Sequence, residues 1–403
     1  MNQPDVQFRC SRPSDAHDLT SMDVLITVTA PLVTRTRPPI NLSLVLDRSG
    51  SMAGSALRLA KRAAQHAVRQ LGPQDLISVV VFDSHVDVLV PPTLAAQTDS
   101  IVQAIESVQS GGSTALHGGW LTGVKQVQTA SQNYSLNRVL VLTDGFANIG
   151  LREPDALASE VARTLTAGVS TSVIGLGNDY HEVLLEALAI AGDGNYCYVE
   201  HPQQLEAVFL AELAGLQATS GQRVSLELSG GPGVSVLEVY NDLPQMPNGR
   251  LRLPNLLLGR PVEVAARLSS AGSPEASLRL RLAWDDVTGG QRRVHREQVT
   301  VPHLATLSQD PAVASVVAAL KVARLKDQAI QASERGDTVA AQRHWYTAEV
   351  MVQAGVSSGL LTDAEAVDLK QVGDRLNRGD QSSASKLARS QNYARRHSKP
   401  LPK

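Results

Sequence analysis

The sequence predicts an α/β protein, in which a doubly wound, mainly parallel sheet is joined to an antiparallel β-sandwich and a C-terminal three-helix bundle. Three observations predict this order. Short apolar runs alternate with helix-length segments from residue 40 to about residue 216, apolar and polar residues alternate through much of 219–305, and helical periodicity fills 306–378. The chain has 403 residues, 43% hydrophobic and 19% charged, which is enough for two or three buried cores.

The α/β domain is predicted over residues 40–218. Its strand candidates are almost continuously apolar, as strands are when helices cover both faces of a parallel sheet. Between the first two strands, apolar residues from Ala56 to Leu71 recur at three-to-four-residue spacing, which predicts a helix with one buried face. The strand candidates are residues 42–46, 76–82, 86–90, 139–143, 169–175 and 196–199.

Residues 1–39 and 219–305 are predicted to form the β-sandwich together. Val24, Ile26 and Val28 recur with the period of two that is typical of a half-buried strand, and similar alternation returns after residue 219. Because the early strand would complete the later sheet, we expect the α/β domain to be inserted into the sandwich. The three helices of the bundle follow over residues 306–378.

Residues 379–403 are predicted to form a solvated basic tail. From residue 381 onward the tail holds six cationic residues and no acidic one: Lys386, Arg389, Arg395, Arg396, Lys399 and Lys403. Uncompensated positive charge attracts nucleic-acid phosphates, and Tyr393 is available to stack on a base, so nucleic-acid binding by the tail is an alternative function. The net charge of −2 gives no such attraction over the whole chain.

The cysteines and the N-terminal residues favour a cytoplasmic location. Cys10 and Cys197 lie far apart and lack the spacing of a zinc site or a disulfide framework, which fits a reducing compartment. Residues 1–6 lack a basic segment followed by an apolar core. No run approaches the roughly 18 apolar residues of a membrane span, so no span is expected.

Oxygen-bearing side chains follow two of the predicted buried strands. Asp47, Ser49 and Ser51 come directly after the first strand, Asp144 comes directly after a later one, and Thr114 ends a glycine-rich loop. Ligands of open α/β sheets bind beyond the carboxyl ends of the strands, where these residues are expected to meet. A set made only of oxygen ligands favours a hard divalent cation, although each segment alone also fits an ordinary turn.

In order and spacing, these three segments resemble the metal-ion-dependent adhesion site of the von Willebrand factor type A domain, over roughly residues 40–216. The resemblance implies a mainly parallel sheet of five to six strands, with a short antiparallel edge strand at 86–90. It implies that Ser49, Ser51 and Thr114 bind Mg²⁺ or Mn²⁺ directly, and that Asp47 and Asp144 bind directly or through water. A carboxylate from a partner protein would complete the coordination. More loosely, the sandwich and bundle resemble those of bacterial relatives of calcium-activated chloride channel regulators.

Two charged residues near these loops are given lesser roles. Arg48 lies between two of the ligand candidates and is expected to point outward, as a solvated side chain or as one that helps to select the partner's charge. Asp83 follows a buried strand and is expected to act as a turn or cap residue.

The expected function is therefore a divalent-metal-dependent protein–protein interaction module, acting as a scaffold or regulator, and not an enzyme. The sequence holds no GxxxxGK[ST] nucleotide loop and no HExxH helix. An adaptor for a partner ATPase is a further alternative. A metal-dependent hydrolase is disfavoured because no base or second metal is identifiable.

Overall fold

The computed structural model describes residues 3–13, 20–31, 37–270 and 275–399. The chain forms two compact units. One comprises Arg35–Ala218, and the other combines Met1–Thr34 with Thr219–Leu401. The α/β unit is thus continuous in sequence, whereas the second unit is built from segments on both sides of it.

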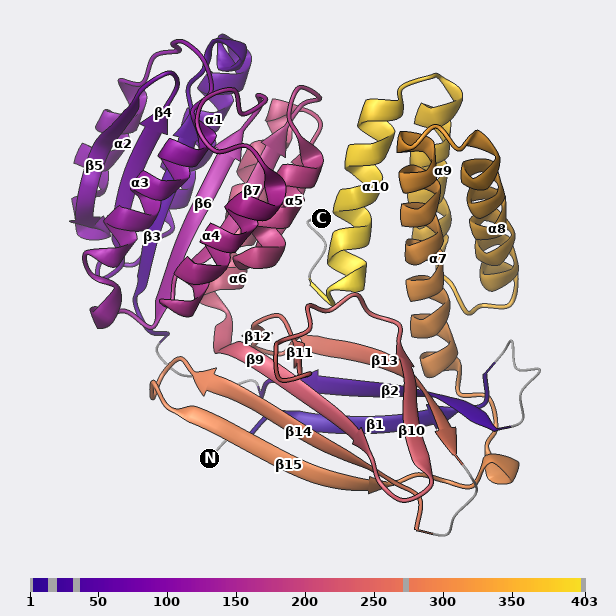
Figure 1. The fold of residues 1–403 in the computed structure, drawn as a ribbon. Coiled ribbons are helices and arrows are strands. Elements are labelled where there is room, and N and C mark those ends of the chain that lie inside the picture. Colours follow the sequence, from indigo (N-terminus) through magenta and orange to yellow (C-terminus); the bar gives the residue numbers. More distant parts are fainter. Residues whose placement is uncertain (1–2, 14–19, 32–36, 271–274, 400–403) are drawn as a thin grey trace. The chain divides into compact units, whose positions relative to one another are not determined.

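The α/β unit contains a six-stranded sheet in the order β5-β4-β3-β6-β7-β8 (Figure 1). Neighbouring strands are parallel except at one edge, where β5 runs antiparallel to β4, so the predicted antiparallel edge strand is confirmed. Every residue of β3, β4 and β6 is buried, which explains their continuously apolar sequences. The strands are β3 (Ile40–Asp47), β4 (Leu76–Phe82), β5 (Val86–Leu94), β6 (Leu136–Thr143), β7 (Ser170–Leu176) and β8 (Asp193–Val199).

Helices cover both faces of this sheet (Figure 1), and α1 contacts both α2 and α6 while α4 contacts α5. Alanines on the inner face of α1 are buried with Leu57 and Val68. The helices are α1 (Ser55–Arg69), α2 (Thr98–Glu106), α3 (Leu116–Gln128), α4 (Pro154–Thr166), α5 (Glu182–Ala191) and α6 (Leu205–Gln217). Short 3-10 turns lie at Gly50–Met52, Ala95–Gln97, Ser131–Asn133 and Pro202–Gln204.

Helix α3 lies unusually close to the sheet because its inner face carries glycines. A Cβ atom at Gly123 would lie only 2.4 Å from Val45 Cγ2, and one at Gly119 would lie 2.6 Å from the ring of Phe82. The close contact fixes the start of α3 against β3 and β4. The loop that precedes α3 is therefore held near the carboxyl ends of these strands.

The second unit contains two antiparallel sheets. One has the order β1-β2-β13-β10 and the other the order β11-β9-β14-β15, with β12 also paired to β9. The N-terminal strands thus share a sheet with strands that follow the α/β unit. The strands are β1 (Asp5–Ser11), β2 (Ser21–Thr29), β9 (Thr219–Gly230), β10 (Val234–Val239), β11 (Leu251–Arg252), β12 (Leu256–Leu257), β13 (Pro261–Ser270), β14 (Ser277–Asp286) and β15 (Arg292–Thr300).

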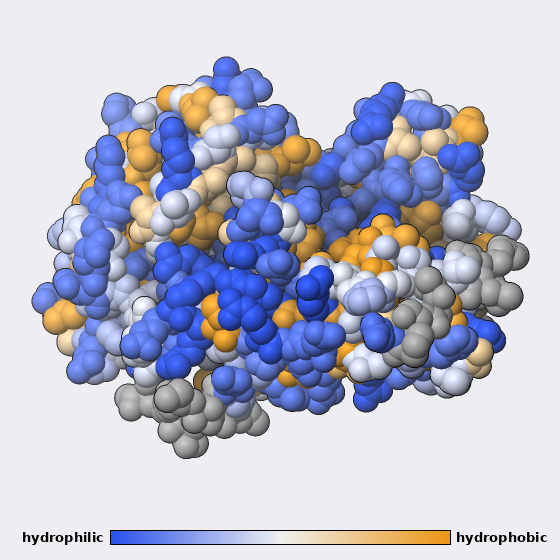
Figure 2. Space-filling model, turned by 60° about the horizontal axis from the view of Figure 1, so that its bottom comes forward, coloured by the Kyte–Doolittle hydropathy of each residue, from blue (hydrophilic) through white to orange (hydrophobic). Residues whose placement is uncertain are grey.

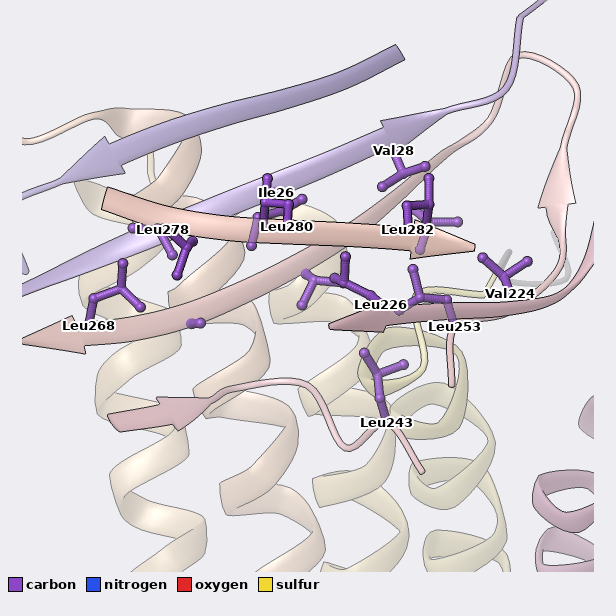
Figure 3. Close-up of a cluster of buried hydrophobic side chains, with 14 of the residues drawn as sticks. Ile26, Val28, Val224, Leu226, Leu243, Leu253, Leu268, Leu278, Leu280 and Leu282 are labelled. Carbon is purple, nitrogen blue, oxygen red and sulfur yellow. The ribbon is translucent and has the colours of Figure 1, made fainter. Parts of the chain in front are cut away.

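The core of this unit lies between the two sheets. In Figure 3, Ile26 and Val28 of β2 lie close to Leu280 and Leu282 of the other sheet, and all four are buried. Alternate residues of β2 therefore face the core, as the period of two indicates. The opposite face of β2 is covered as well, because Leu25 packs with apolar residues of α7.

The helical region consists of four long helices and not three. They are α7 (Pro311–Glu334), α8 (Thr338–Ser357), α9 (Asp363–Asn377) and α10 (Gln381–Arg396), preceded by a short 3-10 turn at Leu304–Thr306. The prediction of a solvated tail after residue 378 is wrong over the described part. Ala384 and Ala388 of α10 are fully buried, and α10 contacts α7 and α9.

The cations of this segment are engaged within the chain. Arg389 forms an ion pair with Glu334 at 3.0 Å, and Arg395 forms one with Glu365. Tyr393, the candidate base-stacking residue, is only 2% exposed. The alternative of nucleic-acid binding depended on free positive charge and an accessible ring, so it loses its basis here. Lys403 lies outside the described residues.

The surface of the chain is mixed in character. On the face that Figure 2 shows, hydrophilic side chains cover most of the area and hydrophobic ones gather in small separate groups. None of the helices in the described ranges combines the length and the apolar composition that crossing a bilayer requires.

Candidate functional site

The candidate site lies beyond the carboxyl ends of β3 and β6. These strands are parallel neighbours, with Leu46 opposite Leu142, so their ends fall at the same edge of the sheet. Asp47 is the last residue of β3, and Asp144 directly follows β6. The register of the sheet therefore brings together two carboxylates that are 97 positions apart in the sequence.

Asp47 is fully buried and organises the loop that follows it. Its Oδ1 atom accepts a hydrogen bond from the backbone N–H of Ser49 at 2.7 Å, and its Oδ2 atom accepts one from Thr143 Oγ1 at 2.5 Å. The first bond closes a tight turn after β3, and the second links β3 to β6. The carboxylate is thus held in one orientation from both sides.

The hydroxyls of the first loop face Asp144. Ser49 Oγ lies 3.1 Å from Ser51 Oγ, and Ser51 Oγ donates to Asp144 Oδ1 at 2.6 Å. Adjacent ligands of an octahedral Mg²⁺ ion, each about 2.1 Å from the metal, lie roughly 3 Å apart. Both distances from Ser51 Oγ are therefore close to the spacing of adjacent ligands on one ion.

Thr114 reaches the same space from the loop before α3. A Cβ atom at Gly145 would lie 2.9 Å from Thr114 Oγ1 and 3.5 Å from Ser51 Oγ, so both hydroxyls face the space beside Gly145. The backbone N–H of Thr114 donates to Asn148 Oδ1 at 2.8 Å, which ties the threonine to the loop after β6. All five residues singled out in the sequence thus meet at one place.

Backbone hydrogen bonds join the first two loops directly. The N–H of Gly50 donates to the carbonyl of Gly112 at 2.9 Å, and the N–H of Gly111 donates to the carbonyl of Arg48 at 2.7 Å. Because these bonds involve the main chain, the spacing between the serine loop and the threonine loop does not depend on side-chain rotamers.

The side chain of Arg48 is not free in solvent, so the expectation of a solvated side chain is wrong. It donates to Asp83 Oδ2 at 3.2 Å and to Asp87 Oδ2 at 2.5 Å. Asp83 also forms the predicted turn, because its Oδ1 accepts from the N–H of His85 at 2.7 Å. Burial alone would raise the pKa of Asp83, but the His85 hydrogen bond and the charge of Arg48 outweigh it and lower the pKa. Arg48 thus anchors the loop.

Two supporting residues, Thr143 and Asn148, were not identified from the sequence. Thr143 holds Asp47, and Asn148 holds Thr114. A polar residue at the buried end of an otherwise apolar strand was a usable signal for Thr143. The side chain of Asn148 gave no such signal, because asparagine is common in loops.

The electrostatics of the site favour a cation. The pKa of Asp144 is raised to about 6. Burial is the largest cause and the charges of Asp47 and Asp179 add to it, while the hydrogen bond from Ser51 acts in the opposite direction. Burial likewise raises the pKa of Asp47, against the hydrogen bonds from Ser49 and Thr143. Two carboxylates whose ionised forms are disfavoured by burial, and for Asp144 also by the charge of Asp47, fit a site in which a divalent ion supplies the missing positive charge.

The donor set fits a hard cation that binds neutral oxygens. Across the described ranges, no three His, Cys, Asp or Glu side chains gather as a metal site. The donors that meet at this site are three hydroxyls and two carboxylates. Such a set suits Mg²⁺ or Mn²⁺ and is unlike the nitrogen and sulfur ligands that zinc prefers.

Residues 41–211 match the family model for the von Willebrand factor type A domain, and the chain therefore contains a domain of this family. Domains of this family often mediate protein–protein interactions. The predicted α/β fold class, with its mainly parallel sheet, antiparallel sheets and C-terminal helical region, is confirmed, although this region holds four helices and not three.

Several proteins are similar to the chain over this domain. The protein named uncharacterized protein YfbK, from Escherichia coli (strain K12), is 28% identical over 197 residues, which are 48% of this chain and 34% of that protein. The human inter-alpha-trypsin inhibitor heavy chain H3 is 26% identical over 164 residues, 39% of this chain and 18% of that protein. The chain thus spans only a minor part of the length of both relatives.

Two solved structures share the fold over most of the chain. A von Willebrand factor type A protein from Catenulispora acidiphila has a TM-score of 0.70 at 19% identity. The matched region is 92% of this chain and 90% of the solved one. The ArnB paralog VWA2 from Sulfolobus acidocaldarius has a TM-score of 0.60 at 17% identity, and the matched region is 96% of this chain and 98% of that protein. At these identities the likeness concerns the fold alone.

Proposed function

We propose that the chain is a divalent-cation-dependent protein-binding module. Asp47, Ser49, Ser51, Thr114 and Asp144 would hold one Mg²⁺ or Mn²⁺ ion, and an Asp or Glu side chain of a partner protein would complete its coordination. The observation that carries this proposal is the meeting of hydroxyl and carboxylate oxygens from three separate loops in one small space.

The make-up of the ligand set supports an external carboxylate. Hydroxyl oxygens are neutral, so an ion bound mainly by them keeps much of its positive charge. Magnesium also requires six ligands in near-octahedral geometry, and a position that the protein leaves open is filled by water or by an anion. A protein carboxylate adds the charge that the site lacks.

A binding role, without catalysis, fits the surroundings of the site. Among the described residues, Asp47 and Asp144 accept hydrogen bonds from hydroxyls and a backbone amide, and no histidine or lysine that could act as a general base bonds to either carboxylate. Residues 355–359 have the Gly-x-Ser-x-Gly spacing of a hydrolase nucleophile, but they lie at the end of α8 instead of between a strand and a helix. We also propose a cytoplasmic location, because a reducing compartment keeps thiols such as those of Cys10 and Cys197 free.

The proposal is tested by affinity capture with the immobilised full chain. Cell extract from the source of the protein is applied in Mg²⁺ or in EDTA, and the retained proteins are quantified by mass spectrometry. The variants are Ser51→Ala, which removes one proposed ligand, and Ser113→Ala, which removes an exposed hydroxyl of the neighbouring loop that lies outside the ligand set.

We expect a set of proteins that is retained in Mg²⁺, released by EDTA, lost with Ser51→Ala and kept with Ser113→Ala. Retention of the same proteins in EDTA and by Ser51→Ala would contradict a role for the metal.

A further inference from the structure

Two large apolar side chains are exposed on the loop that follows Asp144. Phe146 is 53% exposed and Ile149 is 40% exposed, although most large apolar residues of the α/β unit are buried. Exposing such side chains costs free energy in water, and a pair of them beside a binding site is typical of a contact surface.

The backbone holds both side chains next to the proposed ligands. The N–H groups of Asn148 and Ile149 lie 3.2 and 3.4 Å from the carbonyl of Thr114, to which they donate, while Asn148 Oδ1 accepts from the N–H of Thr114. Phe146 is two residues from Asp144 in the same loop. The apolar pair is thus fixed to the two loops that supply Thr114 and Asp144.

The charges around the site limit what a partner can use there. Arg48, the cation within the serine loop, is already paired with Asp83 and Asp87. Asp179, an exposed carboxylate, lies near enough for its negative charge to act on Asp144. A bound ion would therefore supply the attraction for one carboxylate, and Phe146 and Ile149 would add an apolar contact beside it.

We propose that Phe146 and Ile149 form an apolar rim that contacts hydrophobic side chains of the partner. The partner is accordingly a protein segment in which an Asp or Glu is flanked by large apolar residues, such as Leu, Ile, Val or Phe. This inference rests on the proposed function, because the carboxylate of the same segment binds the ion.

The test uses two fluorescent peptide pools of equal length, each with a central Glu. The flanking positions are drawn from Leu, Ile, Val and Phe in the apolar pool and from Ser, Thr, Asn and Gly in the polar pool. A third pool replaces Glu by Gln in the apolar background. Binding to the full chain is measured by fluorescence anisotropy in Mg²⁺ and in EDTA.

The variants are Phe146→Ser with Ile149→Ser, and Leu94→Ser as a matched control. Leu94 is 45% exposed and pairs with Leu76 at the start of β4, so it lies at the opposite end of the sheet from the site. All three substitutions concern exposed side chains, and thermal melting checks that the variants fold.

In Mg²⁺ we expect the apolar Glu pool to bind about ten-fold more tightly than the polar pool, as burial of one or two partly exposed apolar side chains allows. The advantage disappears in the Phe146 and Ile149 variant, persists in Leu94→Ser, and requires both Mg²⁺ and the central Glu. Equal, Mg²⁺-dependent binding of the two Glu pools, or an advantage that survives in the double variant, overturns the rim and leaves the metal role standing.

The two claims fail in different ways. An apolar advantage that is unchanged in EDTA and in the Gln pool, yet lost in the double variant, overturns the metal-dependent function and leaves the rim as a hydrophobic contact. No binding of either Glu pool in Mg²⁺ overturns both.

Discussion

Replacing Thr143 by Val is predicted to weaken metal binding without removing any proposed ligand. Valine has nearly the same shape as threonine but lacks the hydroxyl that donates to Asp47 Oδ2 at 2.5 Å. Both residues are fully buried, so no water can take the place of the lost donor without rearrangement. The change also removes the longer contacts of Thr143 Oγ1 with the N–H and the carbonyl of Gly145, at 3.3 and 3.4 Å, so the bond to Asp47 is the shortest of the interactions that are lost.

The magnitude follows from the charge and burial of the acceptor. A hydrogen bond to a charged group contributes about 1.5–3 kcal/mol to stability, and we expect the free energy of unfolding to fall within that range. Loss of a group that orients a metal ligand lowers metal affinity about 10- to 100-fold. The Mn²⁺ dissociation constant, measured by isothermal titration calorimetry, should rise by that factor.

Thr171→Val is the matched control. Thr171 is also a fully buried strand residue, and its Oγ1 accepts from Trp120 Nε1 at 3.1 Å, away from the site. This variant should lose about 1 kcal/mol of stability in urea denaturation and keep its Mn²⁺ affinity. Equal Mn²⁺ affinity of Thr143→Val and the wild type would refute the reasoning, as would equal losses of affinity in the two variants.

Three further predictions concern stability. Gly123→Ala should lower the free energy of unfolding in urea by about 1–3 kcal/mol, because the new Cβ would lie 2.4 Å from a valine methyl group of β3. In the control Gly215→Ala the space around the new Cβ is open, so stability should be unchanged or slightly higher. The same loss of stability in both variants would contradict the steric argument. Asp75→Asn should lower the free energy of unfolding by about 2–3 kcal/mol, because the buried carboxylate accepts two hydrogen bonds from Arg37 and further ones from backbone amides. An unchanged midpoint of urea denaturation would count against this prediction. Burial, assisted by nearby positive charges, lowers the pKa of His397 to about 3 from 6.5, so the ring stays neutral in the folded chain and gains a proton on unfolding below about pH 6.5. The neutral ring's contribution to stability is therefore present above that pH and is lost as the pH falls. From pH 7 to pH 5, the free energy of unfolding of the wild type should fall by about 2 kcal/mol more than that of His397→Gln. Equal losses in the two proteins would show that the histidine is not responsible.

The α/β fold was predictable because its signals are local. Strands β3, β4 and β6 are buried along their whole length, and this is visible as uninterrupted apolar sequence. The five proposed ligands directly follow these strands or lie just before a helix, so knowledge of parallel-sheet topology sufficed to bring them to one edge.

The supporting residues of the site could not be predicted in the same way. The bonds of Thr143 to Asp47 and of Asn148 to Thr114 join positions 96 and 34 residues apart. Their existence depends on strand register and on loop conformations that no short pattern encodes. The same holds for Arg48, whose partners Asp83 and Asp87 belong to another loop and to β5.

Helix α10 was missed because its burial does not use large apolar residues. Its inner positions are mostly alanine, serine and asparagine, and even Lys386 is only 2% exposed. Small residues allow close packing against α7, and Arg389 finds Glu334, 55 positions earlier, as its partner. Composition alone therefore made this segment look like a solvated tail.

The most direct measurement of the central claim is Mn²⁺ binding to the full chain, followed by electron paramagnetic resonance, in the wild type and in Ser51→Ala, Thr114→Ala and Asp144→Ala. These residues come from three different loops. The account predicts one Mn²⁺ per wild-type chain, displaced by Mg²⁺ and weakened at least ten-fold by each of the three changes. Wild-type binding that persists in any one of them would contradict a single ion shared by the three loops.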